Sequence, residues 1–245
     1  MKSNSLALPC PVACLQEPIL ANIAQHHGLI VSAPPGTGKS SRLPLWLLQS
    51  SFLANKKIIV LEPRRMAVRA LGRYMASLLG ETPGQTVGWR IRGESVGNNC
   101  RILVVTEGVL LRMLQKAPTL DDIGCVIFDE FHERSLQSDL GLALCLESQA
   151  ALRDDLRLIV MSATLDIEKT RELMGNCPVL TCDAPAWPVD IRWEAFVGTD
   201  RTCGPAFLQH VAKITNFISG RGDRARRGSL LQCQGFRPRS GGCPC

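Results

Sequence analysis

The sequence predicts an α/β fold, an open doubly wound sheet of mostly parallel strands with helices on both faces. Short apolar runs alternate along the chain with longer segments of helical period, which is typical of parallel strands joined by crossover helices. Runs such as IIVL at 58–61 and CVIF at 125–128 are apolar without interruption. Strands of a parallel sheet are covered on both faces, so such runs are expected of them.

The predicted strands share a short apolar run. They are Leu29–Ala33, Lys57–Leu61, Arg101–Thr106, Cys125–Asp129 and Leu156–Ser162. The helices predicted between them share an apolar face. They are Lys39–Gln49, Arg65–Leu79, Gly108–Gln115, Ser138–Glu147 and Ile167–Met174.

After Pro188 the pattern weakens. Residues 189–193 could form a strand, and a helix is indicated by one apolar face made of Phe207, Val211, Ile214 and Ile218. From Gly220 onward no period is visible, so we expect an irregular C-terminal tail.

The composition describes a globular chain without a membrane span. Of its 245 residues, 45% are hydrophobic and 20% charged, and no apolar run approaches the ~20 residues that a span needs. The formal charge is +6, but six Arg and one Asp lie in residues 221–245, so the rest of the chain carries only +1. The charge therefore does not predict a broadly basic nucleic-acid-binding body.

The 11 cysteines include no paired C-x-x-C of a zinc site, and we expect no metal cluster. The apolar stretch from Leu6 to Cys14 resembles an export signal, but it is short and broken by Pro9 and Pro11. We therefore expect reduced thiols and a cytoplasmic location. The adjacent His26 and His27 have no third ligand nearby in the sequence, and we interpret them as surface residues.

A glycine-rich loop, APPGTGKS at 33–40, follows the first predicted strand and opens the first predicted helix. Such a loop directs backbone N–H groups and a helix N-terminus at one point, which suits a di- or triphosphate. Gly36 and Gly38 permit the close approach, Lys39 neutralises the β and γ phosphates, and Ser40 offers its hydroxyl to Mg²⁺. The candidate nucleotide contacts are completed by Thr37 and Ser41. Ala33 departs from the usual glycine at its position, and a chance turn is the alternative interpretation.

An acid pair, Asp129 and Glu130, ends the apolar run VIF at 126–128. Ligands of open α/β sheets bind at the carboxyl ends of strands, where this pair lies. Asp129 can hold Mg²⁺ through water, and Glu130 can bind the same ion or polarise the water that attacks a γ phosphate. The alternative is that the two acids only cap the next segment.

Further strings follow other predicted strands: EPRR at 62–65, TEGVLLR at 106–112, DEFHERS at 129–135 and SAT at 162–164. With the phosphate loop, and in this order, they resemble the first RecA-like domain of a superfamily 2 DExH/DEAH-box helicase, and most closely the bacterial HrpB family. The resemblance covers roughly residues 8 to 220. It implies a RecA-like P-loop NTPase fold, an ATP-dependent RNA helicase activity, ATP and Mg²⁺ as cofactors, and single-stranded RNA or DNA as partner.

The resemblance also implies roles for particular residues. His132 belongs with the catalytic residues, and together with the hydroxyls of Ser162 and Thr164 it would couple the state of the γ phosphate to movement of the nucleic acid. The residues implied in holding the sugar-phosphate backbone are Arg64, Arg65, Thr106, Glu107, Gly108 and Arg112. Taken alone, Ser162 and Thr164 could simply cap a helix, and the Arg pair could be a solvated face.

Selection of the nucleotide base is left open by the sequence. Related helicases often stack the base on an Arg of the helix that follows the PRR string. Arg69, Arg73 and Tyr74 lie on that helix here, and any of them could stack on a base or be an ordinary surface residue. We therefore expect loose nucleotide selectivity.

The expected domains are 1–195, a first RecA-like domain; 196–220, a linker and helix; and 221–245, a basic tail. Helicases of this group need arginines from a second RecA-like domain for hydrolysis. We expect this chain to lack that domain, through a frameshift near residue 231, and to be impaired in hydrolysis and unwinding. The rival hypothesis is a non-catalytic nucleotide- or RNA-binding module; a small-molecule kinase is disfavoured by the strings at 129–135 and 162–164.

Overall fold

The computed structural model describes residues 10–97, 99–163, 167–183 and 207–213. The chain divides into two units, residues 1–187 and 188–245. In the second unit residues 207–213 are helical, which agrees with the start of the helix predicted there. The strand predicted at 189–193 lies outside the described residues.

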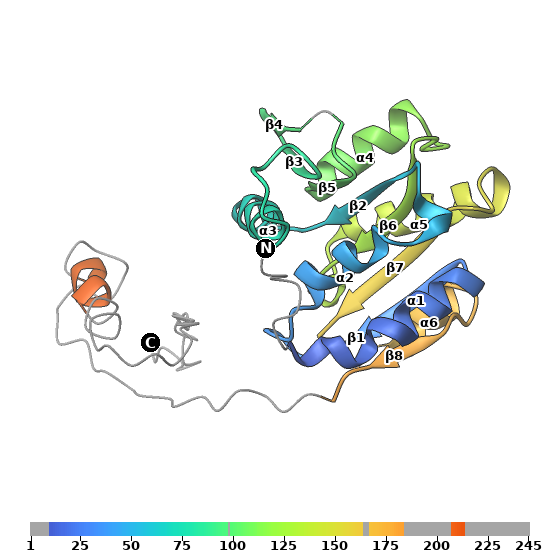
Figure 1. The fold of residues 1–245 in the computed structure, drawn as a ribbon, viewed down its shortest axis with the longest axis horizontal. Helices are drawn as coiled ribbons and strands as arrows, with labels where there is room; N and C mark the ends of the chain where they lie inside the picture. Colours follow the sequence, from blue (N-terminus) through green and yellow to red (C-terminus); the bar gives the residue numbers. More distant parts are fainter. Residues whose placement is uncertain (1–9, 98, 164–166, 184–206, 214–245) are drawn as a thin grey trace, which may run out of the picture. The chain divides into compact units, whose positions relative to one another are not determined.

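The first unit is built on one eight-stranded sheet with the order β4-β3-β5-β2-β6-β7-β1-β8 (Figure 1). Its neighbouring strands are parallel except for the pair β3 and β4. The strands are β1 (Gly28–Ser32), β2 (Lys57–Leu61), β3 (Val87–Ile91), β4 (Glu94–Val96), β5 (Ile102–Val105), β6 (Ile123–Phe128), β7 (Arg157–Ser162) and β8 (Val179–Thr181).

Helices connect these strands. The α-helices are α1 (Gln16–Gln25), α2 (Lys39–Leu47), α3 (Arg65–Leu78), α4 (Glu107–Lys116), α5 (Leu136–Ala151) and α6 (Ile167–Leu173). Short 3₁₀ turns are η2 (Pro11–Leu15), η3 (Ser51–Leu53) and η4 (Phe131–Glu133). Within the described ranges, no helix combines the length and the apolar character needed to cross a membrane.

Alternate residues of each strand face opposite layers of the core, as β2 shows. Ile58 and Val60 belong to the cluster that packs with α1, α2 and α3, whereas Ile59 and Leu61 belong to the cluster that packs with α4 and α5. All four side chains are essentially inaccessible to solvent. Helices therefore cover both faces, which is the geometric reason for uninterrupted apolar strands and confirms the predicted doubly wound α/β fold.

The sequence placed most of these elements. Each strand and helix predicted between residues 29 and 174 is present within two residues at its ends, apart from α5, which continues to Ala151. Helix α1, the hairpin of β3 and β4, and strand β8 were not predicted. These strands lack the continuous apolar run used to predict the others, because Gly88 and Arg90 interrupt β3, and β4 and β8 are only three residues long.

One close contact tests how α3 packs against the sheet. A Cβ built on Gly72 of α3 would lie 2.7 Å from Cε3 of Trp89 in β3. Gly72→Ala is therefore expected to destabilise the chain by about 1–3 kcal/mol, because the tight contact outweighs the gain in helix propensity. The measurement is the free energy of unfolding in urea.

Gly141→Ala is the matched control. Gly141 is also a buried helical glycine, but its Cβ would meet Leu110 at 3.5 Å and Phe128 at 3.6 Å, which are ordinary contacts. This variant is expected to equal or exceed the wild type in stability by up to about 1 kcal/mol. If both variants lost stability equally, the packing of Gly72 against Trp89 would be contradicted.

Candidate active site

The glycine-rich loop lies between β1 and α2. Gly36 has φ 78° and Gly38 has φ 91°, in the left-handed region that glycine enters without strain. Two hydroxyls stabilise the loop from within: Thr37 Oγ1 donates to the Pro34 carbonyl at 2.9 Å, and Ser41 Oγ donates to the Gly38 carbonyl at 3.2 Å. The loop is thus held in shape at the N-terminus of α2, where first-turn N–H groups lack partners within the helix.

Sheet order brings the loops after several strands together. Strand β7 lies between β1 and β6, and β6 also pairs with β2, all in parallel. The loops are joined by backbone bonds: Ala33 N donates to the Ser162 carbonyl at 3.1 Å, and Asp129 N donates to the Leu61 carbonyl at 3.0 Å. The phosphate loop, the acid pair and the SAT segment therefore share one edge, where open α/β sheets bind ligands.

A chain of polar contacts crosses this edge. Lys39 Nζ lies 3.4 Å from Glu130 Oε1, and His132 Nε2 lies 3.4 Å from Glu130 Oε2. On its other ring nitrogen, His132 accepts a hydrogen bond from the backbone N–H of Ala163 at 3.4 Å. This bond makes Nδ1 the acceptor and leaves Nε2 to face Glu130. Residues from the loops after β1, β6 and β7 are thereby connected in a single line.

Asp129 is the most enclosed acid of the site, with 2% of its surface exposed. Its Oδ1 accepts from the Glu130 N–H at 2.9 Å, but its Oδ2 is buried without a hydrogen-bond partner in the described part of the chain. Burial raises the pKa of Asp129 to about 6, and hydrogen bonding by the Ser40 side chain opposes this shift. A buried carboxylate oxygen without a partner, next to a hydroxyl, fits a divalent cation such as Mg²⁺.

His132 also approaches the end of β7 through a small cavity of about 110 Å³. His132, Ser162, Phe131 and Thr170 are among the residues that line it. The second predicted coupling residue, Thr164, lies outside the described residues.

The turn η4 that carries His132 is bounded by residues in an unusual backbone conformation. Glu130 has φ 51° and Arg134 has φ 49°, which a residue with a side chain adopts only at a cost of order 1–3 kcal/mol. Phe131 lies between them, 4% exposed, with its ring edge-on to Phe128 at 6.2 Å between centroids. The buried ring anchors the turn and so fixes how Glu130 and His132 are aimed.

The segment after the acid pair also contacts residues predicted to hold nucleic acid. Arg64 Nη2 forms an ion pair with Glu133 Oε1, and Ser135 Oγ donates to Glu107 Oε1 at 2.6 Å. Arg65 reaches the Arg92 carbonyl at 2.8 Å. These contacts join the segment after β6 to the segments that follow β2 and β5.

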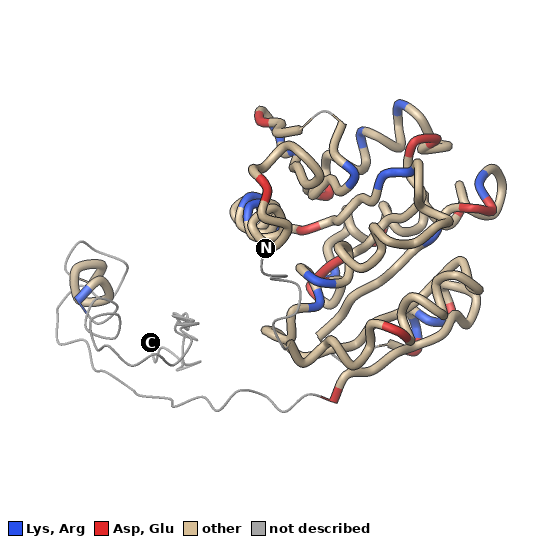
Figure 2. The backbone as a smooth tube through the Cα atoms, in the orientation of Figure 1, with Lys and Arg blue, Asp and Glu red and all other residues tan. Residues whose placement is uncertain are grey.

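The remaining candidates for nucleic-acid contact lie at the start of α4 and on it. Thr106 is the residue before its first turn, Gly108 lies within that turn, and Arg112 is exposed one turn later. Acidic and basic residues are interspersed over the described body (Figure 2). Contact with a polyanion would therefore depend on placed groups such as Arg64, Arg65 and Arg112.

Three residues of the site were not assigned from the sequence: Glu62, Glu133 and Ser135. Glu62 directly follows the apolar strand β2, as Asp129 follows β6, and that parallel position is a signal that could have identified it. Burial, and after it the charges of Asp129 and Glu130, raise the pKa of Glu62 to about 8. The ion pair of Glu133 and the hydrogen bond of Ser135 depend on chain crossings that sequence spacing does not reveal.

The residues considered for base stacking have other contacts. Arg69 forms a forked ion pair with Glu94, with Nη2 at 2.6 Å and Nε at 3.0 Å from Oε2. The guanidinium of Arg73 lies 5.6 Å from the ring centroid of Trp89. Tyr74 is half exposed.

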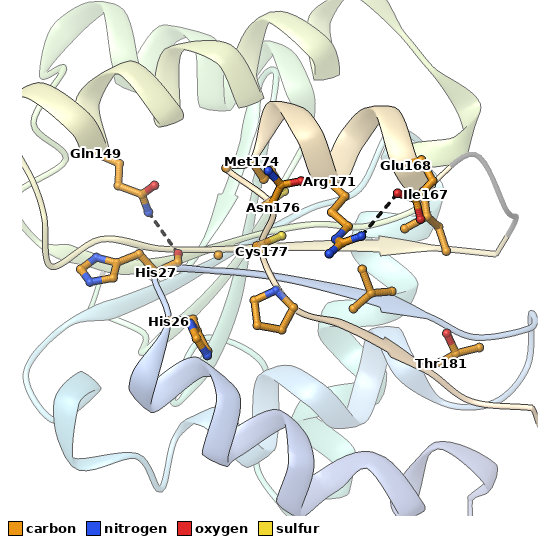
Figure 3. A pocket seen from close by; sticks show the side chains of 14 residues that line it. His26, His27, Gln149, Ile167, Glu168, Arg171, Met174, Asn176, Cys177 and Thr181 are labelled. Carbon is orange, nitrogen blue, oxygen red and sulfur yellow. Dashed lines mark hydrogen bonds and ion pairs between the residues drawn. The ribbon is translucent and has the colours of Figure 1, made fainter.

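A larger depression of about 730 Å³ lies elsewhere, at the amino end of β1 and beside α6 (Figure 3). His26 and His27, both exposed, are among its lining residues, as are Arg171 and Cys177. No residue of the phosphate loop or acid pair lines it. Within the described ranges, no group of three or more His, Cys, Asp or Glu side chains could hold a metal ion.

The raised pKa of Glu62 predicts a pH dependence of stability. Between the usual pKa of 4.5 and about 8, the folded chain keeps a proton that the unfolded chain releases, so stability falls as the pH rises through this window. Each unit of pKa corresponds to about 1.4 kcal/mol. Glu62→Gln is therefore expected to be more stable than wild type near pH 8 and similar to it near pH 4.5, measured as the free energy of unfolding.

Glu94→Gln is a control of opposite sign. The hydrogen bond from Arg69, and to a smaller extent that from Trp89, lowers the pKa of Glu94. The charged carboxylate therefore stabilises the fold at pH values above its usual pKa, and this stabilisation is lost as the pH falls through the lowered pKa. This variant is expected to be less stable than wild type near neutral pH, with the difference shrinking in acid. If Glu62→Gln changed the free energy of unfolding equally at pH 4.5 and pH 8, the inference that Glu62 is buried in its protonated form would be contradicted.

Comparison with known proteins assigns a family to this fold and site. The model of the family described as DEAD/DEAH box helicase matches residues 14–173. The ATP-dependent RNA helicase HrpB of Escherichia coli is 49% identical over 184 residues, which are 75% of this chain and 23% of that protein. The human ATP-dependent RNA helicase DHX29 is 36% identical over 192 residues, 74% of this chain and 14% of that protein. The chain thus spans less than a quarter of the length of these relatives.

A solved structure agrees with the sequence comparisons. The crystal structure of the Escherichia coli DEAH/RHA helicase HrpB superposes with a TM-score of 0.73 at 44% identity, and the match covers 85% of this chain and 27% of that one. The RecA-like fold and the resemblance to HrpB expected from the sequence are confirmed. The chain belongs to the DEAD/DEAH box helicase family.

Proposed function

We propose that this chain is the first RecA-like domain of an ATP-dependent RNA helicase of the DExH type, which binds and hydrolyses NTP with Mg²⁺ to move along single-stranded nucleic acid. The observation that carries the proposal is the line of contacts from Lys39 through Glu130 and His132 to Ala163. The relatives named above are ATP-dependent RNA helicases. We assign residues 1–195 to this domain, 196–220 to a linker and 221–245 to a basic tail, in a cytoplasmic protein.

The phosphate loop is the proposed nucleotide site. Backbone N–H groups of residues 36–41 and the N-terminus of α2 attract the phosphates, and Lys39 neutralises the β and γ groups. Lys39 is 3% exposed and contacts Glu130, so its ammonium group is already directed into the site. Nucleotide binding would exchange part of this carboxylate contact for phosphate oxygens.

The acid pair is the proposed catalytic centre. Ser40, Asp129 and Glu130 would hold Mg²⁺, which would supply positive charge to neutralise the phosphates of the nucleotide. Glu130 would polarise the attacking water, and the His132 Nε2 contact fixes the orientation of that carboxylate. His132 would act with Ser162 and Thr164 to report the state of the γ phosphate to the rest of the domain.

The proposed nucleic-acid face comprises Arg64, Arg65, Thr106, Glu107, Gly108 and Arg112. Guanidinium groups pair with phosphate oxygens and a helix N-terminus offers N–H groups, so binding of single-stranded RNA or DNA would depend on the backbone and little on sequence. Glu133 and Ser135 support this assignment, because they connect Arg64 and Glu107 to the segment that follows the acid pair. Occupation of Arg64 by RNA would release Glu133.

Lys39→Ala tests the nucleotide site. Loss of a charge-assisted contact is expected to weaken binding of a fluorescent ATP analogue with Mg²⁺ by about 10- to 100-fold. Lys57→Ala is the matched control, because Lys57 is the first residue of β2 and so lies at the edge of the sheet away from the site. Its Nζ is 3.7 Å from Asp122. RNA-stimulated phosphate release should also fall in Lys39→Ala. Equal phosphate release by wild type and Lys39→Ala would favour the non-catalytic binding module.

Glu133→Gln and Arg64→Ala test the nucleic-acid face. Arg64→Ala is expected to weaken binding of a single-stranded RNA and to flatten its salt dependence, because one phosphate contact is lost. Glu133→Gln is expected to strengthen binding several-fold, because Arg64 no longer has a competing carboxylate. The double variant should show no gain over Arg64→Ala, measured by fluorescence anisotropy. A gain that persisted without Arg64 would mean that Glu133 acts by general charge alone.

A further inference from the structure

Two cysteines far apart in the sequence have their sulfur atoms in contact. Cys14 Sγ lies 3.9 Å from Cys182 Sγ, across a separation of 168 residues. Cys14 lies in η2, just before α1, and Cys182 directly follows β8, the outermost strand on that side of the sheet (Figure 1). The contact therefore joins the beginning and the end of the described part of the first unit.

Both sulfurs are held in place by backbone contacts. Cys14 Sγ donates to the Pro11 carbonyl at 3.2 Å, and Cys182 Sγ lies 3.5 Å from the same oxygen. The Cys182 N–H donates to the Ser32 carbonyl of β1 at 2.8 Å, so this residue is fixed to the sheet. A disulfide has a sulfur separation of about 2.05 Å, so the two sulfur atoms need to approach by roughly 2 Å to form one.

The two thiols differ in their exposure to solvent. Cys14 is exposed, whereas Cys182 is 4% exposed. An accessible thiol beside an enclosed one is the arrangement in which an external oxidant reacts first with one sulfur and the neighbour then resolves the product. The core thiols of Cys125 and Cys145 are poor nucleophiles, since burial raises the pKa of both.

We propose that Cys14 and Cys182 are a modification site that forms a reversible disulfide with a small disulfide oxidant such as oxidised glutathione. The Cys14 thiolate attacks the oxidant, its S–S bond breaks, and one reduced glutathione leaves. The Cys182 thiolate then attacks Cys14 Sγ and displaces the second glutathione. The protein loses two protons and two electrons in forming one S–S bond, and oxidised glutathione becomes two reduced molecules.

The segment that contains Cys14 contacts the phosphate loop. Val12 N donates to the Thr37 carbonyl at 3.2 Å, and Cys10 Cβ lies 3.4 Å from the position that a Cβ on Gly38 would take. The turn η2, which carries Cys14, therefore packs directly against the phosphate loop. A bond to Cys182 would connect that turn to the end of β8 and would close a ring of chain that contains all eight strands of the sheet.

The test treats the full chain with oxidised glutathione and maps disulfides by mass spectrometry of non-reduced peptides. A variant with Cys203, Cys233, Cys243 and Cys245 replaced by Ser is used beside the wild type, to exclude exchange with those thiols. We expect a Cys14–Cys182 linkage and a rise in the unfolding temperature of about 5–15 °C that dithiothreitol reverses, because the closed ring is long.

Single substitutions separate the roles of the two thiols. Cys182→Ser should retain glutathione as a mixed disulfide on Cys14, and Cys14→Ser should abolish the linkage. Cys10→Ser, in the same segment, should leave it intact. Linkage of Cys14 to another cysteine, or stable glutathione on Cys14 while Cys182 is present, would overturn the proposal. None of these readouts requires nucleotide or RNA, so they are independent of the proposed function.

Discussion

The arrangement of the molecule depends on the parallel register of β1, β7, β6 and β2. Parallel strands end at the same edge, and the hydrogen bonds that continue past the strands align the loops that follow. A residue shift between β1 and β7 or between β7 and β6 would separate Lys39 from Glu130, and a shift between β7 and β6 would also separate His132 from Ala163. The register is specified because both faces of each strand are buried and a one-residue slip would exchange them.

The shared edge also concentrates negative charge. Glu62, Asp129 and Glu130 converge there, and within the described site Lys39 lies against Glu130. The raised pKa values of Glu62 and Asp129 express the free energy needed to keep these acids enclosed. A divalent cation would reduce that cost at Asp129, so metal binding and the protonation of the site should be linked.

The sequence predicted the strands that build the core and the residues that follow them. Continuous apolar runs identify buried strands, and a glycine-rich loop and an acid pair at strand ends indicate a phosphate site. It did not predict the β3–β4 hairpin, whose strands have no uninterrupted apolar run, or the contacts of Arg64 with Glu133 and of Ser135 with Glu107. Those contacts join loops after different strands, and no local period records which loops meet.

The two ends of the sheet are both made by strands of three residues, β4 on one side and β8 on the other. An outermost strand presents unpaired backbone groups to which another chain can add a strand, and the number of such groups grows with its length. Short outermost strands therefore limit edge-to-edge self-association.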